Sequence, residues 1–181
     1  RSYDLVTCLY IDQEKFEKLK IGQVPIYEPG LPELLEISRG NLHFTTSYDE
    51  AGIETCDVVF IAVGTPSLPD GSADLTYVKS AADTLGAHLD HIFTVVVNKS
   101  TVPIGSGNWV EKLLREAYVR RKGLQPDGKY AVASNPEFLR QGSALLDTLY
   151  PDRVVIGSEE ARAIDTLTNL YRPILNQDFP A

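Results

Sequence analysis

The sequence predicts an α/β fold in which a parallel β-sheet is covered by helices. Short apolar runs rich in Val and Ile alternate with helical stretches along the 181 residues of the chain. Two of these runs, "DVVFIAV" (57–63) and "FTVVVN" (93–98), contain consecutive apolar residues instead of a strict alternation with polar ones. Such runs are typical of strands that are buried on both faces of a parallel sheet. A chain of this length suffices for one domain with a sizeable core.

The predicted elements follow one another without an internal repeat, a low-complexity tract or a linker. Strands are expected at 4–11, 42–46, 57–63, 93–98, 129–134 and 153–157. Helices are expected at 12–20 with Asp12 as N-cap, within 24–40 after a proline-rich elbow, around 49–54, at 75–89, at 106–121 and at 159–171.

Composition excludes several classes of protein. The formal net charge is -8, and the basic residues cluster only at 120–122, which argues against a nucleic-acid partner. No run is long and apolar enough to cross a membrane, and no signal peptide is visible. The two cysteines, Cys8 and Cys56, indicate a reducing, cytoplasmic compartment without a disulfide framework. Because the chain starts at Arg1 and contains no methionine, we expect it to be part of a longer protein.

Three predicted strands end in loops of similar composition. The loops are "GTPS" (64–67), "KSTVPIG" (99–105) and "SNPEFLRQG" (134–142). Gly and Pro fix the backbone of such loops and allow its N–H groups to approach a phosphate or a ring closely. Ordinary turn chemistry explains any one of them alone. Three such loops at the carboxyl edge of one parallel sheet indicate a ligand site.

Five motifs occur in a fixed order: "PIYEPGL", "FIAVGTPS", "KSTVPIG", "NPEFL" and "YPDRVVIG". In this order and at these spacings they resemble the UDP-glucose/GDP-mannose dehydrogenase family, and most closely its members that oxidise UDP-glucose. The resemblance covers the chain from about Val6 to Pro173. It implies a Rossmann-like, doubly wound parallel sheet that binds NAD. Residues 1–181 would form an incomplete NAD-binding domain, and the UDP-binding substrate domain would be absent.

The resemblance also implies an activity. Members of this family oxidise the primary alcohol of a nucleotide sugar to a carboxylate, reduce two NAD and pass through a cysteine thioester. The whole protein would convert the UDP-sugar substrate UDP-glucose to UDP-glucuronate, whereas this chain alone would be inactive. Two alternatives stay open: a dehydrogenase for GDP-mannose or UDP-N-acetylmannosamine, and a non-catalytic nucleotide-binding module. The family's cysteine nucleophile and the central helix of its homodimer lie beyond Ala181.

The resemblance assigns site residues by their place in the motifs. The cofactor-binding set comprises Tyr10, Lys15, Val63, Gly64, Thr65, Pro66, Ser67, Ser100, Thr101, Val102 and Gln141. The substrate-binding set comprises Glu137, Phe138, Leu139, Arg140 and Gln141. Thr101 would hold a catalytic water, and Glu137 would assist proton transfer when that water attacks the thioester.

Physical chemistry agrees with the catalytic role of Glu137. A carboxylate just after a buried strand, beside Phe138 and Leu139, is expected to be partly desolvated. Desolvation disfavours the charged form, as a general base working near neutral pH requires. Taken without its neighbouring motifs, Glu137 is better explained as a carboxylate at the N-terminal end of a following helix, where a negative charge complements the helix dipole.

Several positions depart from the family pattern. No glycine-rich loop or first strand precedes residue 4, so the strand that is central in the family's sheet is expected to be absent from this chain. Tyr10 stands where the family has an acid that binds the adenosine ribose, and Asp12 is a possible substitute. Lys15 matches a basic residue that the family has near the adenosine end, and it is equally compatible with a solvated ion pair to neighbouring glutamates. Gln141 replaces a second glutamate and is expected to make contacts without acid–base work.

The remaining polar residues carry no predicted chemistry. Cys8 and Cys56 are expected to be small buried hydrophobic residues and not the nucleophile. His43, His88 and His91 lie away from every strand-end loop and are expected on the surface. No metal-ligand spacing occurs, so no metal site is expected.

Overall fold

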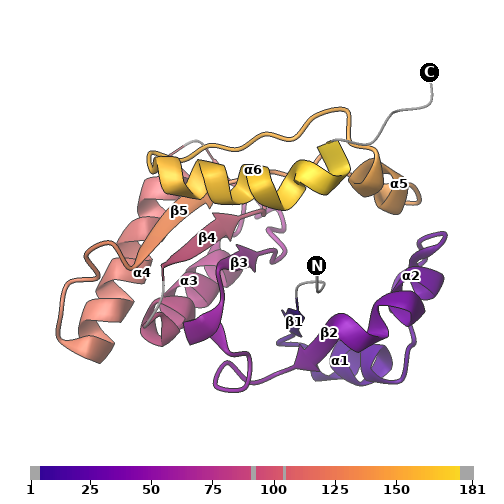
Figure 1. Cartoon of the computed structure of the whole chain (residues 1–181), viewed down its shortest axis with the longest axis horizontal. Coiled ribbons are helices and arrows are strands. Elements are labelled where there is room, and N and C mark those ends of the chain that lie inside the picture. Colours follow the sequence, from indigo (N-terminus) through magenta and orange to yellow (C-terminus); the bar gives the residue numbers. More distant parts are fainter. Residues whose placement is uncertain (1–4, 91–92, 104, 176–181) are drawn as a thin grey trace. The chain divides into compact units, whose positions relative to one another are not determined.

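The computed structural model describes residues 5–90, 93–103 and 105–175. The chain forms two compact units, which Figure 1 shows in sequence colours. The first unit contains residues 1–52 and 138–152, and the second contains residues 53–137 and 153–181. The chain therefore passes from the second unit to the first at Glu137, inside the "NPEFL" motif, and returns after Asp152.

The first unit is built on two parallel strands. β1 (Val6–Leu9) pairs with β2 (Leu42–Thr45), with Val6 opposite Leu42. The helices of this unit are α1 (Gln13–Lys20), α2 (Leu31–Ser38) and α5 (Ala144–Leu149), and a short 3-10 turn, η1 (Arg39–Asn41), follows α2.

The predicted N-cap in this unit is confirmed. Asp12 is the N-cap of α1, because its carboxylate accepts a hydrogen bond from the Lys15 backbone N–H at 3.1 Å. Pro32 lies in the first turn of α2, where its missing N–H is not needed. Gly30 precedes that helix with a φ of 80°, a left-handed conformation that residues with a Cβ rarely adopt.

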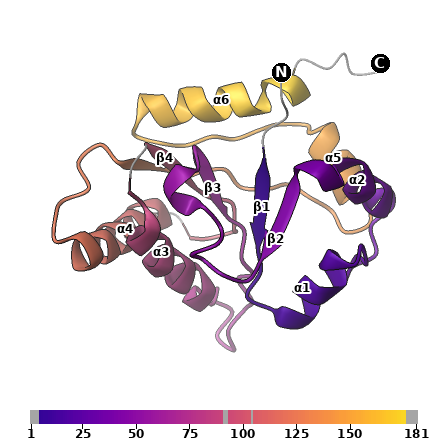
Figure 2. The same ribbon diagram turned by 60° about the horizontal axis from the view of Figure 1, so that its bottom comes forward.

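The second unit contains a three-stranded parallel sheet. Its order is β3 (Val58–Ile61), β4 (Thr94–Asn98) and β5 (Tyr130–Ser134). Figures 1 and 2 show α3 (Thr76–His88) and α4 (Ser106–Lys122) together on one face of this sheet, and α6 (Ala161–Leu175) on the other. Every residue of β4 is buried, as the continuous apolar run predicted.

The face beneath α6 shows why the central strand is apolar throughout. Val95 and Val97 pack with two alanines of β5 and with Ala163 and Leu167 of α6. The alternate residue Val96 is also completely buried and points to the opposite face, because side chains alternate along a strand. The hydrophobic core of this unit therefore lies on both sides of β4.

α3 and α4 pack closely at Gly86. A Cβ atom built on Gly86 would lie 2.4 Å from the Leu114 carbonyl oxygen and 2.8 Å from the Ala117 Cβ. Only a residue without a side chain allows the two helices to approach this closely. α4 then ends at Gly123, whose φ of 70° lets its N–H bond to the Val119 carbonyl.

The structure corrects two predicted elements. Residues 49–54 form turns that lead into a short 3-10 helix, η2 (Ile53–Thr55), and not a regular helix. Residues 153–157 form no strand, because only Gly157 bridges to β5, antiparallel to Ser134. Within this segment, the Val155 backbone carbonyl accepts a hydrogen bond from a side chain, the Asn135 amide, at 2.8 Å.

The prediction of a single sheet is also modified. All strand pairs among the described residues are parallel, as expected, but they form two sheets, β1–β2 and β3–β4–β5. β1 therefore pairs on one side only, and so does β3, within the described part of the chain. None of the helices described there has the length and apolar character needed to cross a membrane.

Candidate functional site

The carboxyl ends of β3, β4 and β5 are joined by hydrogen bonds. The Lys99 N–H after β4 donates to the Ile61 carbonyl of β3 at 2.9 Å, and the Asn135 N–H after β5 donates to the Asn98 carbonyl of β4 at 3.0 Å. The loops that begin at Gly64, Lys99 and Ser134 therefore start side by side at one edge of one sheet. Ligands of open α/β sheets bind at this edge.

The first of these loops is held by its own hydrogen bonds. It contains the candidate residues Val63 to Ser67 and folds back on itself, with Ser67 bridged to Ala73. The Pro66 carbonyl accepts from the Asp74 N–H at 2.8 Å. Gly64 is exposed, and no atom lies within 4 Å of the position that a Cβ would occupy there. This loop thus offers a fixed backbone with open space beside it.

The second loop contains Ser100, Thr101 and Val102. The Ser100 side chain is only 6% exposed, and its hydroxyl donates to the Val63 carbonyl at 2.7 Å. That hydroxyl joins the second loop to the first. Thr101 is exposed and Val102 is half-buried. Of the two hydroxyls predicted here, the one on Thr101 is therefore the one open to solvent.

The third loop contains Glu137, which is half-buried. Among the described residues, its Oε2 is buried without a hydrogen-bond partner, and so are both polar atoms of the Asn98 side chain. A buried polar atom without a partner costs free energy unless a ligand or water satisfies it. Burial lowers the pKa of the Lys99 ammonium, and the negative charge of Glu137 opposes that change. Buried polar atoms and opposite charges therefore lie at the carboxyl edge of the sheet.

Sequence reasoning missed the role of Asn135. This residue is 2% exposed, and its Oδ1 accepts from the Tyr171 hydroxyl and from Lys99 Nζ, the latter at 3.3 Å. Its amide also donates to the Val155 carbonyl. Asn135 thereby fixes the start of the third loop. An asparagine placed directly after an apolar strand is the signal that identifies such a residue in the sequence.

The first unit holds the candidates for the adenosine end. Tyr10 is half-buried and its ring lies 6.5 Å from that of Phe44, between centroids. Burial raises the pKa of its phenol. Lys15 is exposed, and its Nζ lies 3.7 Å from the Asp12 carboxylate, so its ion pair is with the helix cap and not with a glutamate.

Phe138 to Gln141 also belong to the first unit. Phe138 and Leu139 are exposed, at 47% and 44%. The Arg140 guanidinium donates to Asp147 at 2.6 and 3.2 Å, and the Arg140 backbone N–H donates to the same carboxylate at 2.9 Å. Asp147 therefore holds both the side chain and the backbone of Arg140. Gln141 is exposed.

The Arg140–Asp147 contact predicts a pH-dependent stability. Hydrogen bonds from the Arg140 side chain and backbone lower the pKa of Asp147 from its usual 3.8 to about 2. Folding thus favours the charged carboxylate, so its contribution is complete above pH 3.8 and is lost as the pH falls through about 2. In the full-length protein, Asp147→Asn should make the free energy of unfolding depend less on pH between 3.8 and about 2. The urea midpoint of unfolding, measured at a series of pH values, checks this.

The matched control for this measurement is Asp165→Asn, at an exposed position of α6. This variant should keep the pH dependence of the unchanged protein. If Asp147→Asn also kept it, the contact with Arg140 would not exist in solution.

The remaining titratable candidates lie outside this arrangement. Burial raises the pKa of the thiols of Cys8 and Cys56, which disfavours the nucleophilic thiolate. Cys8 is in β1, and Cys56 precedes β3. His43 is exposed, whereas His88 is half-buried, with its Nδ1 2.8 Å from the Thr84 carbonyl oxygen; His91 lies outside the described residues. In the part of the chain that is described, no three potential metal ligands cluster.

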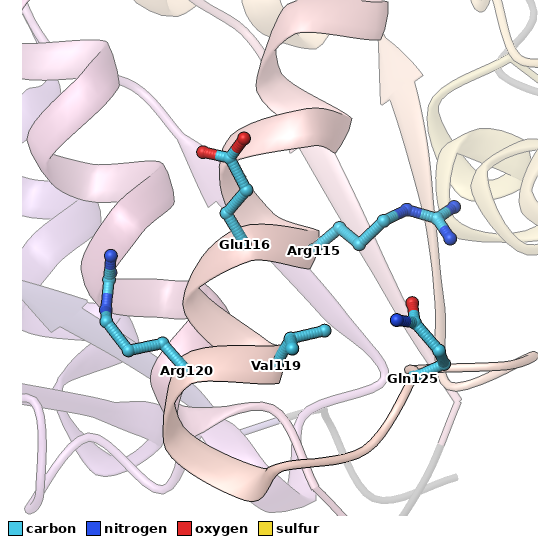
Figure 3. A pocket seen from close by; sticks show the side chains of 5 residues that line it. All are labelled: Arg115, Glu116, Val119, Arg120 and Gln125. Atoms are coloured by element: carbon cyan, nitrogen blue, oxygen red, sulfur yellow. The ribbon is translucent and has the colours of Figure 1, made fainter.

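A hollow of about 380 Å³ lies elsewhere on the second unit. Figure 3 shows it on α4, where its charged side chains point away from one another and do not converge. Arg120, for example, forms a 2.6 Å ion pair with Asp83 of α3. None of the candidate residues lines this hollow; its lining comprises Arg115, Glu116, Val119, Arg120 and Gln125. The candidate site is thus an open edge of the sheet and not this cavity.

Comparison with known proteins agrees with this geometry. Residues 3–175 match the NAD binding domain of the UDP-glucose/GDP-mannose dehydrogenase family. The chain is 48% identical to the UDP-glucose 6-dehydrogenase of Pseudomonas aeruginosa over 172 residues, which cover 94% of this chain and 37% of that protein. The corresponding enzyme of Rhizobium meliloti is 48% identical over 178 residues, covering 95% of this chain and 39% of that protein.

Solved structures give the same result. A UDP-glucose dehydrogenase from Pyrobaculum islandicum superposes with a TM-score of 0.82 at 43% identity, covering 93% of this chain and 38% of that one. A GDP-mannose dehydrogenase from Pseudomonas aeruginosa has the same TM-score at 32% identity, covering 94% and 39%.

Parallel strands whose loops meet at one carboxyl edge are the arrangement in which open α/β domains bind their ligands. Because residues 3–175 match an NAD binding domain, the ligand of this domain is NAD. The chain belongs to the UDP-glucose/GDP-mannose dehydrogenase family and spans less than two fifths of the length of the relatives described above.

Proposed function

We propose that this chain is the NAD-binding part of an enzyme that oxidises UDP-glucose to UDP-glucuronate. The observation that carries the proposal is that hydrogen bonds join the three strand-end loops, the third of which contains Glu137. The preference for UDP-glucose rests on similarity, since identity is 48% to UDP-glucose 6-dehydrogenases and 32% to a GDP-mannose dehydrogenase.

The residues present fit a bound NAD. The open space beside Gly64 suits the close approach of a nucleotide, and the unpartnered Oε2 of Glu137 offers an acceptor at the same edge of the sheet. We assign Val63 to Ser67 to the adenosine and ribose side, and residues 100–102 to the nicotinamide side, together with Gln141. Tyr10 and Lys15 would contact the adenosine end. NAD supplies the hydride acceptor for both oxidation steps.

Glu137 and Thr101 supply the proton handling in this scheme. The exposed Thr101 hydroxyl can donate one hydrogen bond and accept another, which suits a residue that orients a water. The Glu137 carboxylate can accept a proton from that water as it attacks the thioester. The Lys99 ammonium interacts electrostatically with Glu137. Phe138 to Arg140 would border the sugar nucleotide.

The complete enzyme contains more than this domain in our proposal. In the family's strand order, a first strand followed by a glycine-rich loop separates the strands equivalent to β1 and β3. Each of these two strands pairs on one side only among the described residues, which supports that assignment. The cysteine nucleophile, the UDP-binding domain and the helix of a homodimer would be contributed by other parts of the protein, so residues 1–181 alone should be inactive.

The proposal is tested with the full-length protein and purified nucleotide sugars. We expect NADH formation with UDP-glucose, at two NADH per UDP-glucuronate, and little with GDP-mannose or UDP-N-acetylmannosamine. Preference for either of the latter would assign a different substrate. Binding of NAD without oxidation of any of the three would instead indicate a non-catalytic module.

Thr101→Ala gives a second test within the full-length protein. Loss of one orienting hydrogen bond should lower kcat about tenfold and leave the Kd for NAD nearly unchanged. Steady-state kinetics and NAD titration measure the two quantities. The matched control is Thr168→Ala at an exposed position of α6. A large loss of NAD affinity in Thr101→Ala would reassign the residue to cofactor binding.

A further inference from the structure

We propose that Glu28 is a positioning residue that fixes the conformation of 138–142, a segment that contains the residues assigned above to the nucleotide sugar. This inference rests on the proposed function. Glu28 belongs to the "PIYEPGL" motif, and nothing in the sequence pattern connects it with the segment more than a hundred positions further on.

The contact between the two segments is direct. Glu28 Oε2 accepts a hydrogen bond from the Gly142 N–H at 3.1 Å, and Oε1 accepts one from the Leu145 N–H at 3.0 Å. Both donors belong to the same unit as Glu28. One carboxylate thus uses both of its oxygens to hold the backbone at the end of the segment and in the first turn of α5.

Burial makes this contact specific for a carboxylate. Glu28 is 7% exposed, and a buried charge is tolerated only where hydrogen bonds replace its hydration. Gly30 brings the same turn close to α5, since a Cβ built there would lie 3.0 Å from the Leu145 Cδ2. A glutamine at position 28 would keep the shape but would turn an NH₂ donor toward one of the two N–H donors.

A second carboxylate holds the other part of the segment. Asp147 accepts from the Arg140 N–H and guanidinium, and also from the Ser143 hydroxyl at 3.2 Å. The backbone of the segment is therefore fixed at Arg140 and at Gly142, while Phe138, Leu139 and Gln141 remain exposed. Fixed backbone with exposed side chains is the arrangement that a preorganised binding segment requires.

The test compares Glu28→Gln with Glu33→Gln, an exposed glutamate of α2, in the full-length protein. Glu28→Gln should raise the KM for UDP-glucose about tenfold, the effect of losing one hydrogen bond to a charged group. The KM for NAD should rise less, because Gln141 is the one residue of this segment that is assigned to NAD, and Glu33→Gln should change neither value. A role confined to stability predicts a lower Tm with both KM values unchanged, and that result would overturn the proposal.

Hydrogen exchange of the unchanged protein gives an independent measure. Peptides covering 139–148 should exchange slowly with and without UDP-glucose, because Glu28 already orders the segment. Fast exchange that slows only when the sugar nucleotide binds would show that the ligand orders the segment, and would overturn the proposal even if Glu28→Gln failed to fold. If the unchanged protein oxidised no nucleotide sugar, the proposed function itself would fail, a result that is distinct from any behaviour of the Glu28 variant.

Discussion

Glu137→Gln in the full-length protein is expected to slow thioester hydrolysis about 10²-fold or more, the usual range for loss of a general base. The first hydride transfer should be nearly unaffected, because the amide keeps the volume and hydrogen bonding of the side chain and loses only its ability to take a proton. Stopped-flow measurement should therefore show a rapid burst of NADH followed by a slow steady state. The structure makes Glu137 suited to this role, since its Oε2 is buried without a hydrogen-bond partner among the described residues.

The control for this experiment is Glu159→Gln, at an exposed position just before α6. It should retain both phases at the rates of the unchanged protein. Equal slowing of the burst and of the steady state in Glu137→Gln would contradict a base role and would indicate substrate positioning instead.

Gly86→Ala is expected to destabilise the second unit by about 3 kcal/mol or more, at the upper end of the cost of overpacking a core. The new Cβ would lie 2.4 Å from the Leu114 carbonyl oxygen and 2.9 Å from the Leu114 Cα. Both are backbone atoms, so no rotation of a flexible side chain can relieve the contact. α3 and α4 would have to separate, which would open the core beneath them. Urea unfolding of the full-length protein measures the loss.

Gly107→Ala is the matched control, because it makes the same change near the start of α4. The nearest atom to a Cβ there is the Ser134 Oγ at 3.9 Å, an ordinary van der Waals distance. Stability should be unchanged or rise by up to about 1 kcal/mol, since alanine is the better helix former. Equal behaviour of the two variants would show that the helices do not approach as closely in solution as Gly86 implies.

Periodicity and turn chemistry predicted most elements of the fold. The continuous apolar run at 93–98 identified the buried central strand, and Asp12 identified the start of α1. The run at 153–157 was wrong as a strand, because an apolar run does not reveal whether its backbone finds a pairing partner. The short helix around 49–54 was wrong for a related reason: so few residues gain too few hydrogen bonds to offset helix nucleation.

The candidate site was predicted only in outline. The sequence placed three loops at one edge of a sheet, and hydrogen bonds between Ile61, Asn98 and their partners confirm that these loops adjoin. Which hydroxyl points inward was not predictable, since Ser100 and Thr101 are neighbours of similar chemistry and only Ser100 bonds to Val63. Glu28 was missed because its contacts lie 114 and 117 positions away, where no local pattern can indicate them. The assigned roles of Glu137 and Thr101 remain predictions.

Among the residues that the structure describes, β1 and β3 each pair on one side only, which has a practical consequence for work with residues 1–181. Backbone N–H and C=O groups along an open strand edge can recruit the edge of another molecule, the same process that underlies strand-mediated aggregation. β3 also carries Phe60, an apolar side chain that is 38% exposed and can contribute to such an association. Preparations limited to these residues should therefore self-associate as their concentration rises, and longer versions of the protein are the better starting material for crystallisation and enzymology.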